Sequence, residues 1–293
     1  MKLCTYEHGG AVLVGALEGD EIVDLRAADP ALPATMLDLL RGGAGALDRA
    51  RRAAARAERA HRVRRDAVRL LPPIPNPSKI VCIGLNYRDH AAEVKLPLPE
   101  HVAVFAKWNN TLIGDGAPIV LPRVSHRVDY EAELAFVVGA RCRNVTEADA
   151  GAAIAGYTCF NDVSVRDYQS FTSQWTLGKT WDTHGPCGPV LVTADEISDP
   201  QALAIRCSID GETLQDSNTS QMVFGAHRLL TELSAVMTLE PGDLVATGTP
   251  AGVGLARTPR RWIKAGERVR VEIERIGAIE NPAVAEAEAA GGA

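Results

Sequence analysis

Hydrophobic and polar positions divide this chain into two regions with different periodicity. Between residues 2 and 25, short apolar runs are separated by turn residues such as Gly9-Gly10, which predicts strands. A helix is expected from about Ala34 to Leu40, and the alanines and arginines of Gly45–Arg69 favour a second helix. The first region, residues 1–71, is therefore predicted to form a small α+β domain.

A proline-rich segment separates this region from the rest of the chain. Residues 71–77 contain four prolines, a density that breaks helix and strand alike. Beyond it, β-branched runs dominate and helical spacing is scarce, which is typical of a mainly β domain with a few helices. We assign residues 72–285 to that domain and 286–293 to a flexible tail. The expected strands are Ile80–Ile83, Ala117–Leu121, Leu134–Val138, Val190–Thr193, Ala204–Ile209, Leu244–Thr247 and Arg268–Ile273, with helices near 89–94, 147–154 and 226–237.

The composition narrows the range of partners. Of the 293 residues, 46% are hydrophobic and 23% are charged, as in ordinary globular proteins. The net charge of -6 gives no global electrostatic reason to bind nucleic acid or an acidic membrane. Nine arginines between Arg49 and Arg69 have no aromatic residues among them and are diluted by acidic residues. They favour a solvated helix face over a nucleic-acid surface.

Cysteine usage and the absence of long apolar runs predict a cellular location. The six cysteines are scattered and form no CxxC pair, which predicts reduced, buried thiols instead of a disulfide scaffold or a zinc site. No apolar run suits a signal peptide or a membrane span. We therefore expect a cytoplasmic protein.

The run Asp129–Val138 contains two carboxylates, Glu131 and Glu133, where an ordinary strand has more aliphatic side chains. Side chains alternate across a strand, so both glutamates project from one face, and both faces of this run look buried. Bare ionised carboxylates are costly in such surroundings and repel each other. A hard divalent cation such as Mg²⁺, Mn²⁺ or Ca²⁺ removes both problems, because such ions bind carboxylate oxygens. The run therefore indicates half of a metal site.

The best candidate for a third oxygen ligand is Asp162, which ends a second mainly apolar run, Gly156–Asp162. Strand ends are positions from which side chains reach ligands.

A different interpretation of the carboxylates needs no metal. Arg123, Arg127 and Arg166 could neutralise the carboxylates in a non-catalytic, β-rich binding protein.

A candidate for proton transfer lies where the expected strand at Ile80–Ile83 runs through a turn into a helix. His90 and Glu93 are three residues apart, so a helix places them on one face. Glu93 could then hydrogen-bond one imidazole nitrogen and leave the other to take a proton from water. The alternative is an exposed His-Glu pair on a helix surface, which is a common arrangement.

Two further segments could contact a substrate. Lys179 could serve as a fixed cation for a developing oxyanion or enolate, or it could be an ordinary surface lysine. The glycine-rich loop at Thr247–Gly254 could hold a substrate carboxylate through its amides and the Thr249 hydroxyl. A purely structural turn explains the same glycines equally well.

Taken together, these segments resemble the fumarylacetoacetate hydrolase family over roughly residues 75–284, in the branch of acylpyruvate hydrolases and 2-hydroxyhepta-2,4-diene-1,7-dioate isomerases. The resemblance rests on six motifs in the same order. They are Ile83–Tyr87 with His90 and Glu93, Tyr130–Leu134, Asn161–Gln169, Leu177–Lys179, Asn218–Phe224 and Thr247–Gly254.

The resemblance implies a fold, an assembly and a set of site residues. The fold would be α+β and mainly β, a β-roll of folded-over sheets that follows the small N-terminal domain, and the protein would be a homodimer. Mg²⁺ or Mn²⁺ would be held by Glu131, Glu133 and Asp162. The other implied roles are a water-activating dyad at His90 and Glu93, oxyanion stabilisation by Lys179 and Gln169, and contact of Thr249 with the distal end of the substrate.

The activity implied by the resemblance is hydrolysis of a carbon–carbon bond in a 2,4-dioxo acid, because its adjacent oxygens can chelate the metal. An isomerase or decarboxylase of a 2-oxo or 2-hydroxy dioic acid would use the same site without hydrolysis. Retention of both His90 and Glu93 favours the hydrolase. Leu85 stands where acylpyruvate-cleaving relatives often have a basic residue, whereas Trp175–Pro186 resembles the branch for 2,4-dioxo sugar acids and aromatic ring-cleavage products.

Overall fold

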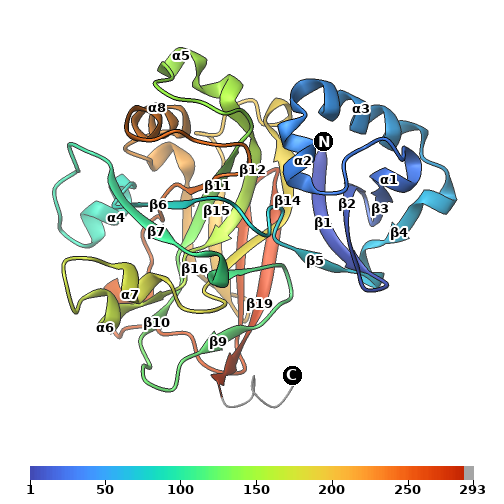
Figure 1. Ribbon diagram of the computed structural model, residues 1–293. Coiled ribbons are helices and arrows are strands. Elements are labelled where there is room, and N and C mark those ends of the chain that lie inside the picture. The colour runs from blue at the N-terminus through green and yellow to red at the C-terminus, as the bar shows by residue number, and fades with distance from the viewer. Residues whose placement is uncertain (287–293) are drawn as a thin grey trace.

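The computed structural model describes residues 1–286 of the chain. The molecule has a small lobe, roughly residues 1–71, and a large lobe formed by the residues that follow. A long mixed sheet crosses from the small lobe to the large one (Figure 1). Its strands are β1 (Lys2–His8), β2 (Ala11–Glu18), β3 (Glu21–Asp24), β4 (Arg62–Arg64), β5 (Arg69–Leu71), β6 (Ile80–Gly84), β7 (Ala103–Lys107), β8 (Leu112–Ile113), β11 (Ala132–Val138), β12 (Ile154–Asn161), β14 (Gly185–Thr193) and β17 (Leu244–Ala246). Their order is β4-β3-β2-β1-β14-β12-β11-β17-β6-β7, with β5 beside β1 and β8 beside β14.

A second sheet packs over the first. It has the order β16-β15-β18-β19-β9, and β10 pairs separately with β13. The bounds are β9 (Ile119–Leu121), β10 (Val128–Asp129), β13 (Ser164–Val165), β15 (Ala204–Ile209), β16 (Glu212–Asn218), β18 (Arg268–Ile273) and β19 (Gly277–Ala285). The helices are α1 (Leu25–Ala28), α2 (Met36–Arg41), α3 (Gly43–Arg56), α4 (Arg88–Glu93), α5 (Glu147–Ala150), α6 (Arg166–Gln169), α7 (Thr176–Lys179) and α8 (Ala226–Val236). The predicted α+β, mainly β class is confirmed.

Every side chain of β11 is buried, and its two faces serve two different cores. Leu134, Phe136 and neighbouring even-numbered residues join the core that lies between the two sheets, together with Ile205 and Val271. Residues Ala135 and Val137 join the core that the helices of the small lobe cover. This explains why the strand contains so few polar residues, and why the acidic ones need partners.

The small lobe differs from the prediction at one place. The helix expected over Gly45–Arg69 ends at Arg56, and the rest of that segment pairs with the sheet as β4 and β5. Val63 lies opposite Ile22, and Leu70 opposite Tyr6. The segments that contain Val63 and Leu70 pair with the edges of β3 and β1. This tertiary pairing outweighs the local helix propensity of alanine and arginine.

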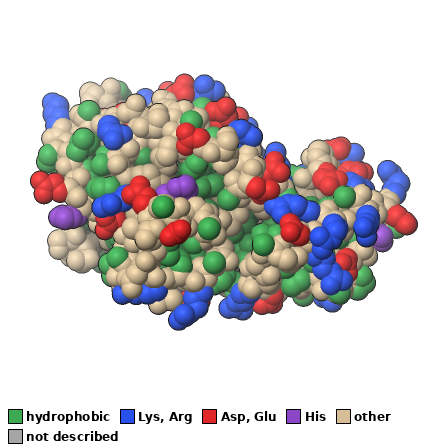
Figure 2. Space-filling model, turned by 90° about the horizontal axis from the view of Figure 1, so that it is seen from above, with side chains coloured by type: hydrophobic (Ala, Val, Ile, Leu, Met, Phe, Trp, Pro, Cys, Tyr) green, Lys and Arg blue, Asp and Glu red, His purple; other side chains and the backbone are tan. Residues whose placement is uncertain are grey.

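The arginines of the small lobe lie largely at its surface, where Figure 2 shows them among acidic side chains. Arg49 pairs with Asp29, Arg64 with Asp66 and Arg51 with Asp195. The long sheet continues across residue 71, because Leu3 of β1 pairs with Leu191 of β14. The domain boundary at residue 71 therefore stays a prediction, and the proposed tail beyond Glu286 lies outside the described residues.

All six cysteines are free, and five of them are buried, whereas Cys142 is half-buried. Within residues 1–286, none of the helices is both long and apolar enough to span a bilayer. The cytoplasmic location stays a prediction.

Candidate metal centre and active site

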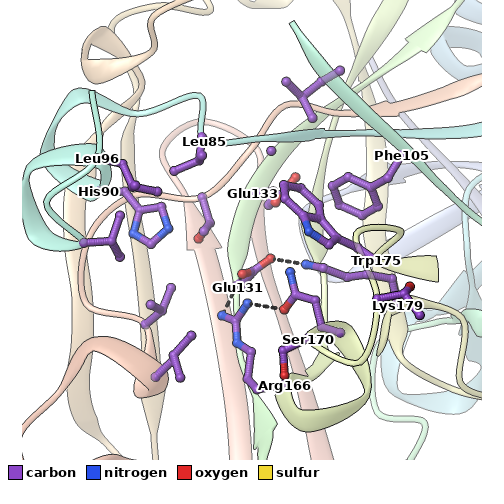
Figure 3. A pocket seen from close by; sticks show the side chains of 18 residues that line it. Leu85, His90, Leu96, Phe105, Glu131, Glu133, Arg166, Ser170, Trp175 and Lys179 are labelled. Carbon is purple, nitrogen blue, oxygen red and sulfur yellow. Dashed lines mark hydrogen bonds and ion pairs between the residues drawn. The ribbon is translucent and has the colours of Figure 1, made fainter. Parts of the chain in front are cut away.

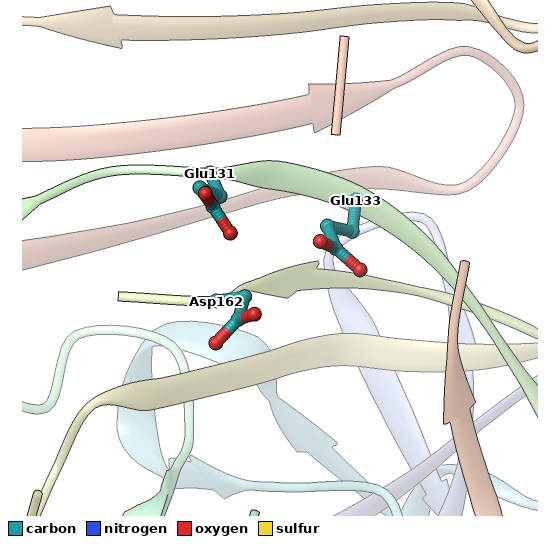
Figure 4. A group of neighbouring side chains, drawn as sticks. All are labelled: Glu131, Glu133 and Asp162. Carbon is teal, nitrogen blue, oxygen red and sulfur yellow. The ribbon is translucent and has the colours of Figure 1, made fainter. Parts of the chain in front are cut away.

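The three carboxylates that the sequence singled out lie together at the ends of β11 and β12 (Figure 4). Glu131 precedes β11, Glu133 lies within it, and Asp162 directly follows β12. The Asp162 amide donates to the Glu131 carbonyl at 2.9 Å, and the Glu131 amide donates to Oδ1 of Asn161 at 3.0 Å. One oxygen from each carboxylate lies within 4.8 Å of the others, and all three residues are buried.

Lys179 bridges two of these carboxylates. Its Nζ lies 2.7 Å from Oε2 of Glu131 and 2.7 Å from Oδ2 of Asp162. The side chain is 3% exposed, so the alternative of an ordinary surface lysine is wrong. Burial lowers the pKa of Lys179, but the two carboxylates outweigh it and raise the pKa to about 12. Lys179 is therefore a fixed cation at the centre.

Two more cations reach the same carboxylates. Lys107, at the end of β7, donates from Nζ to Oδ1 of Asp162 at 2.7 Å and is wholly buried. Nη2 of Arg166 lies 2.7 Å from Oε1 of Glu131 in an ion pair, and Nε donates to Oδ2 of Asp129 at 2.8 Å. Arg166 appears in the sequence reasoning only as a partner in the metal-free alternative. Lys107 was missed, although a lysine closing the apolar run Ala103–Ala106 was a usable signal.

The two glutamates respond to this environment in opposite directions. Burial raises the pKa of Glu131, but Arg166 and Lys179 outweigh it and hold the pKa well below its usual range. Burial, followed by repulsion from Asp162 and Glu131, raises the pKa of Glu133 well above its usual range. Within residues 1–286, Glu133 has no Lys or Arg ion-pair partner, and its Oε2 accepts only from the Gly248 amide at 2.8 Å. Glu133 is the carboxylate whose charge still lacks compensation.

This donor set fits a divalent cation. Three buried carboxylates offer the hard oxygen ligands that Mg²⁺ and Mn²⁺ take. The lysines and Arg166 compensate Glu131 and Asp162 but not Glu133, so a bound cation would supply the missing positive charge. The metal-free alternative is right that an arginine contacts Glu131, but it does not explain Glu133.

The two residues of the predicted dyad, His90 and Glu93, lie on α4 and contact each other. Nδ1 of His90 lies 3.1 Å from Oε2 of Glu93, and Oε1 of Glu93 accepts from the Gly252 amide at 2.9 Å. With Glu93 ionised, Nδ1 holds the proton and Nε2 is left with its lone pair. The side chains are 13% and 22% exposed, and His90 lines a cavity beside the carboxylates, so they are not an exposed surface pair.

The glycine-rich loop supports the dyad through its backbone. Gly252 has φ of 103°, and a Cβ there would lie 2.2 Å from the Leu214 carbonyl oxygen. Only glycine therefore lets its amide reach Glu93. Oγ1 of Thr249 donates to the Ala132 carbonyl at 2.9 Å and accepts from Gln215 at 2.8 Å. The hydroxyl proton of Thr249 is therefore already donated to a backbone carbonyl. The predicted contact of Thr249 with substrate would have to be made by atoms of Thr249 other than this proton.

A cavity of about 360 Å³ joins the dyad to the carboxylates (Figure 3). Gln169 lines it and accepts from Nη1 of Arg166 at 3.0 Å. Phe105 and Trp175, which sequence reasoning did not place in the site, meet edge to face with ring centres 5.5 Å apart. Trp175 begins the segment Trp175–Pro186, which was noted only for its resemblance to one branch of the family, and Phe105 offered only its aromatic character. The roles predicted for Gln169 and Thr249 stay predictions.

The comparisons with known proteins agree with this geometry. Residues 79–284 match the family model described as fumarylacetoacetate (FAA) hydrolase C-terminal, and the chain belongs to that family. It is 47% identical over 269 residues to a Xenopus laevis protein named oxaloacetate tautomerase fahd2, mitochondrial. That match covers 91% of this chain and 84% of the relative.

Solved structures share the whole architecture. A putative HpcE protein from Mycobacterium smegmatis matches with a TM-score of 0.88 at 34% identity, covering 98% of this chain and 100% of the other. Maleylpyruvate hydrolase from Sphingobium sp. SYK-6, in complex with manganese (II) ion and pyruvate, matches with a TM-score of 0.80 at 32% identity, covering 97% and 99%. Enzymes of different reaction types are thus built on this fold and are similar to this chain.

Proposed function

We propose that this protein is a divalent-cation-dependent enzyme that interconverts the keto and enol forms of a 2-oxo acid such as oxaloacetate. The observation that carries the proposal is the position of His90, which contacts Glu93 through Nδ1 and lines a cavity that also opens onto the buried carboxylate centre. Among the described residues, its Nε2 has no hydrogen-bond partner. A base beside a site for a divalent cation suits proton abstraction next to a 2-oxo group. The likeness to oxaloacetate tautomerase favours tautomerisation among the reactions such a site could perform.

In this proposal, Nε2 of His90 takes a proton from C3 of the substrate and the same proton is returned to the 2-oxygen. No atoms are gained or lost, and the reverse sequence restores the keto form. Glu93, held by the Gly252 amide, keeps the imidazole in the tautomer whose Nε2 accepts, and it stabilises the transient imidazolium.

When bound at Glu131, Glu133 and Asp162, a divalent cation would supply Lewis-acid stabilisation of the negative charge that develops on the 2-oxo acid. Lys179 and Lys107 hold the carboxylates in place through ion pairs, and Arg166 donates to Gln169, which lines the cavity. Because Lys179 itself lines the cavity, it adds a fixed positive charge close to the reacting oxygens.

The test follows the enol absorbance of oxaloacetate with purified protein, with Mn²⁺ or Mg²⁺ added and then removed by a chelator. Tautomerisation predicts that enol and keto forms equilibrate faster than in buffer and that total oxaloacetate is conserved. No acceleration with any divalent cation would contradict the proposal.

Hydrolysis of a carbon–carbon bond is the second candidate, favoured by the likeness to maleylpyruvate hydrolase and by the intact dyad. Here His90 would activate a water instead of removing the C3 proton. Mass spectrometry of products from maleylpyruvate and 2,4-dioxo acids separates the two reactions. Hydrolysis adds the mass of water across two fragments, whereas tautomerisation leaves the mass unchanged.

A further inference from the structure

The charged lining residues of the active-site cavity gather at one end of it. Within residues 1–286, Arg166 and Lys179 are the only Arg and Lys side chains that line it, and both form ion pairs with the carboxylates. Nε of Arg166 donates to Asp129 and Nη1 donates to Gln169, while Nη2 is in the ion pair with Glu131 and makes no hydrogen bond to a described residue. No other lysine or arginine of the described chain lines the cavity, so burying a second substrate carboxylate against the far wall without a partner would be costly.

Apart from the charged residues, His90 and the polar residues Gln169, Ser170, Thr172 and Thr249, the side chains that line the cavity are apolar. In Figure 3, Leu85 and Leu96 lie on the side of His90, and Phe105 and Trp175 lie across the cavity from them. Val94, Val253 and Leu255 complete this wall. Leu96 is 49% exposed and Leu255 is 37% exposed, so apolar surface at the mouth remains open to water. Such surface gains free energy when an apolar ligand covers it.

Two local features of the backbone, at Leu85 and at Gly84, fix the position of side chains in this wall. Leu85 has φ of 51°, a left-handed conformation that a branched side chain rarely adopts. Such strained residues persist where the surrounding structure fixes them, and they cluster at binding sites. Gly84 precedes it, and a Cβ there would lie 2.4 Å from the Trp175 ring, so the indole closes directly over the chain. The backbone thus places one aliphatic and one aromatic side chain on the same cavity.

We propose that this apolar wall, formed by Leu85, Val94, Leu96, Phe105, Trp175, Val253 and Leu255, binds an uncharged, apolar substituent of the substrate. The preferred substrate is then a 2-oxo acid with an alkyl or aryl group beyond C3, and compact dicarboxylates such as oxaloacetate use only the charged end. The inference rests on the proposed function, because it takes the 2-oxo acid end to lie at the carboxylate centre. It adds the substrate class that the site prefers.

The first experiment measures the affinity of the Mn²⁺-loaded protein for a series of 2-oxo acids by calorimetry. The series begins with pyruvate, lengthens the alkyl chain one methylene at a time and includes a phenyl-terminated member. Each methylene buried on the wall should tighten binding about fourfold. A matched series that ends in a carboxylate should show no such gain. Affinities that ignore chain length, or that favour the terminal carboxylate, would overturn the inference.

Two leucines of one loop supply a matched pair of variants. Leu96 lines the cavity and Leu98 does not, although both are 49% exposed. Leu96→Ala should weaken binding of the longest alkyl member by about tenfold and leave pyruvate unchanged, whereas Leu98→Ala should change neither. Equal effects of the two variants would show that the loop, and not the wall, sets the affinity.

Leu85 is the second position to test. Leu85→Gly suits the backbone conformation and removes the side chain, so it should fold and lose about tenfold or more of the affinity for the longest alkyl member. Leu85→Arg should reverse the preference towards the carboxylate-terminated series. If oxaloacetate is tautomerised but the alkyl series is flat, the apolar-wall inference fails and the proposed function stands. If the alkyl series holds but no enol is interconverted, the proposed function fails and the apolar wall stands.

Discussion

Two regions of this molecule contain ion pairs between a basic side chain and a carboxylate at similar distances but with different burial. In the small lobe, Arg49 and Asp29 pair at 2.5 Å with side chains 46% and 25% exposed. At the carboxylate centre, Lys179 and Glu131 pair at 2.7 Å with side chains 3% and 7% exposed. Exposed pairs exchange water contacts for each other at little net gain, whereas each buried charge depends on its partners. Similar distances therefore carry very different consequences for stability.

The carboxylate centre also has one carboxylate whose charge a divalent cation could compensate. Lysines and Arg166 compensate Glu131 and Asp162, but Glu133 stays repelled and buried. A carboxylate at the protein surface with the same charged neighbours would instead be stabilised by water. The comparison predicts that changes at the centre have large effects that respond to divalent cations, and that changes in the small lobe have small effects that do not.

The largest expected effect is that of Lys179→Met. This change leaves Oε2 of Glu131 and Oδ2 of Asp162 without their buried cation, and should cost about 3–5 kcal/mol of unfolding free energy in metal-free protein. Saturating Mn²⁺ should restore part of the loss, because a ligand of the native state stabilises it. Urea denaturation with Mn²⁺ and with a chelator measures both quantities. A loss below about 1 kcal/mol would mean that this pair behaves like a surface one.

His90→Ala should lower the rate of enol interconversion by about 10² to 10⁴-fold, since it removes the proposed base. The Mn²⁺-induced rise in melting temperature should match that of the wild type, because His90 is not among the carboxylates of the centre. Glu131→Ala, as a contrast, should lose both the activity and the thermal shift. Normal turnover by His90→Ala would remove the dyad from the mechanism.

Glu133 should make metal-free protein less stable as pH rises. Its pKa in the folded state lies well above the ordinary value of 4.5. The protonated form therefore contributes stability that is complete below about pH 4.5 and is lost as pH rises towards the raised folded pKa. Denaturation midpoints measured in a chelator between about pH 5 and 8 should fall more steeply in the wild type than in Glu133→Gln. Identical pH slopes in the two proteins would contradict this assignment.

The smallest expected effect is that of Arg49→Ala in the small lobe. Removing an exposed ion pair should leave the denaturation midpoint almost unchanged, and divalent cations should not alter the result. The same melting experiments used for Lys179→Met provide the measurement. A clear loss of stability would show that the small lobe depends on its arginines more than their exposure indicates.

Several parts of the site could be predicted because they are written locally in the chain. Glu131 and Glu133 stand out against the apolar residues of one strand, and His90 and Glu93 are separated by a helix spacing. Asp162 was expected at a strand end and lies there, directly after Asn161. These features depend on alternation, helical spacing and element ends, which involve neighbours within a few residues.

Other parts depended on contacts between distant segments. Lys107 reaches Asp162 across 55 positions, and Lys179 reaches Glu131 across 48. The segment after Arg56 became β4 and β5 because vacant edges of β3 and β1 accept it. The intrinsic propensity of alanine and arginine favours a helix in this segment. Backbone pairing and the burial of Val63 and Leu70 outweigh this small difference in free energy.

The sequence by itself therefore determined that two glutamates interrupt one apolar run, that an aspartate ends another, and that a histidine and a glutamate share one helix face. Only the tertiary structure decided which cations compensate them, that Glu133 is left without one, and that Leu85 and Trp175 face each other across one cavity. The physical reason is that composition and periodicity act over a few residues, whereas compensation of a buried charge depends on which strands lie side by side.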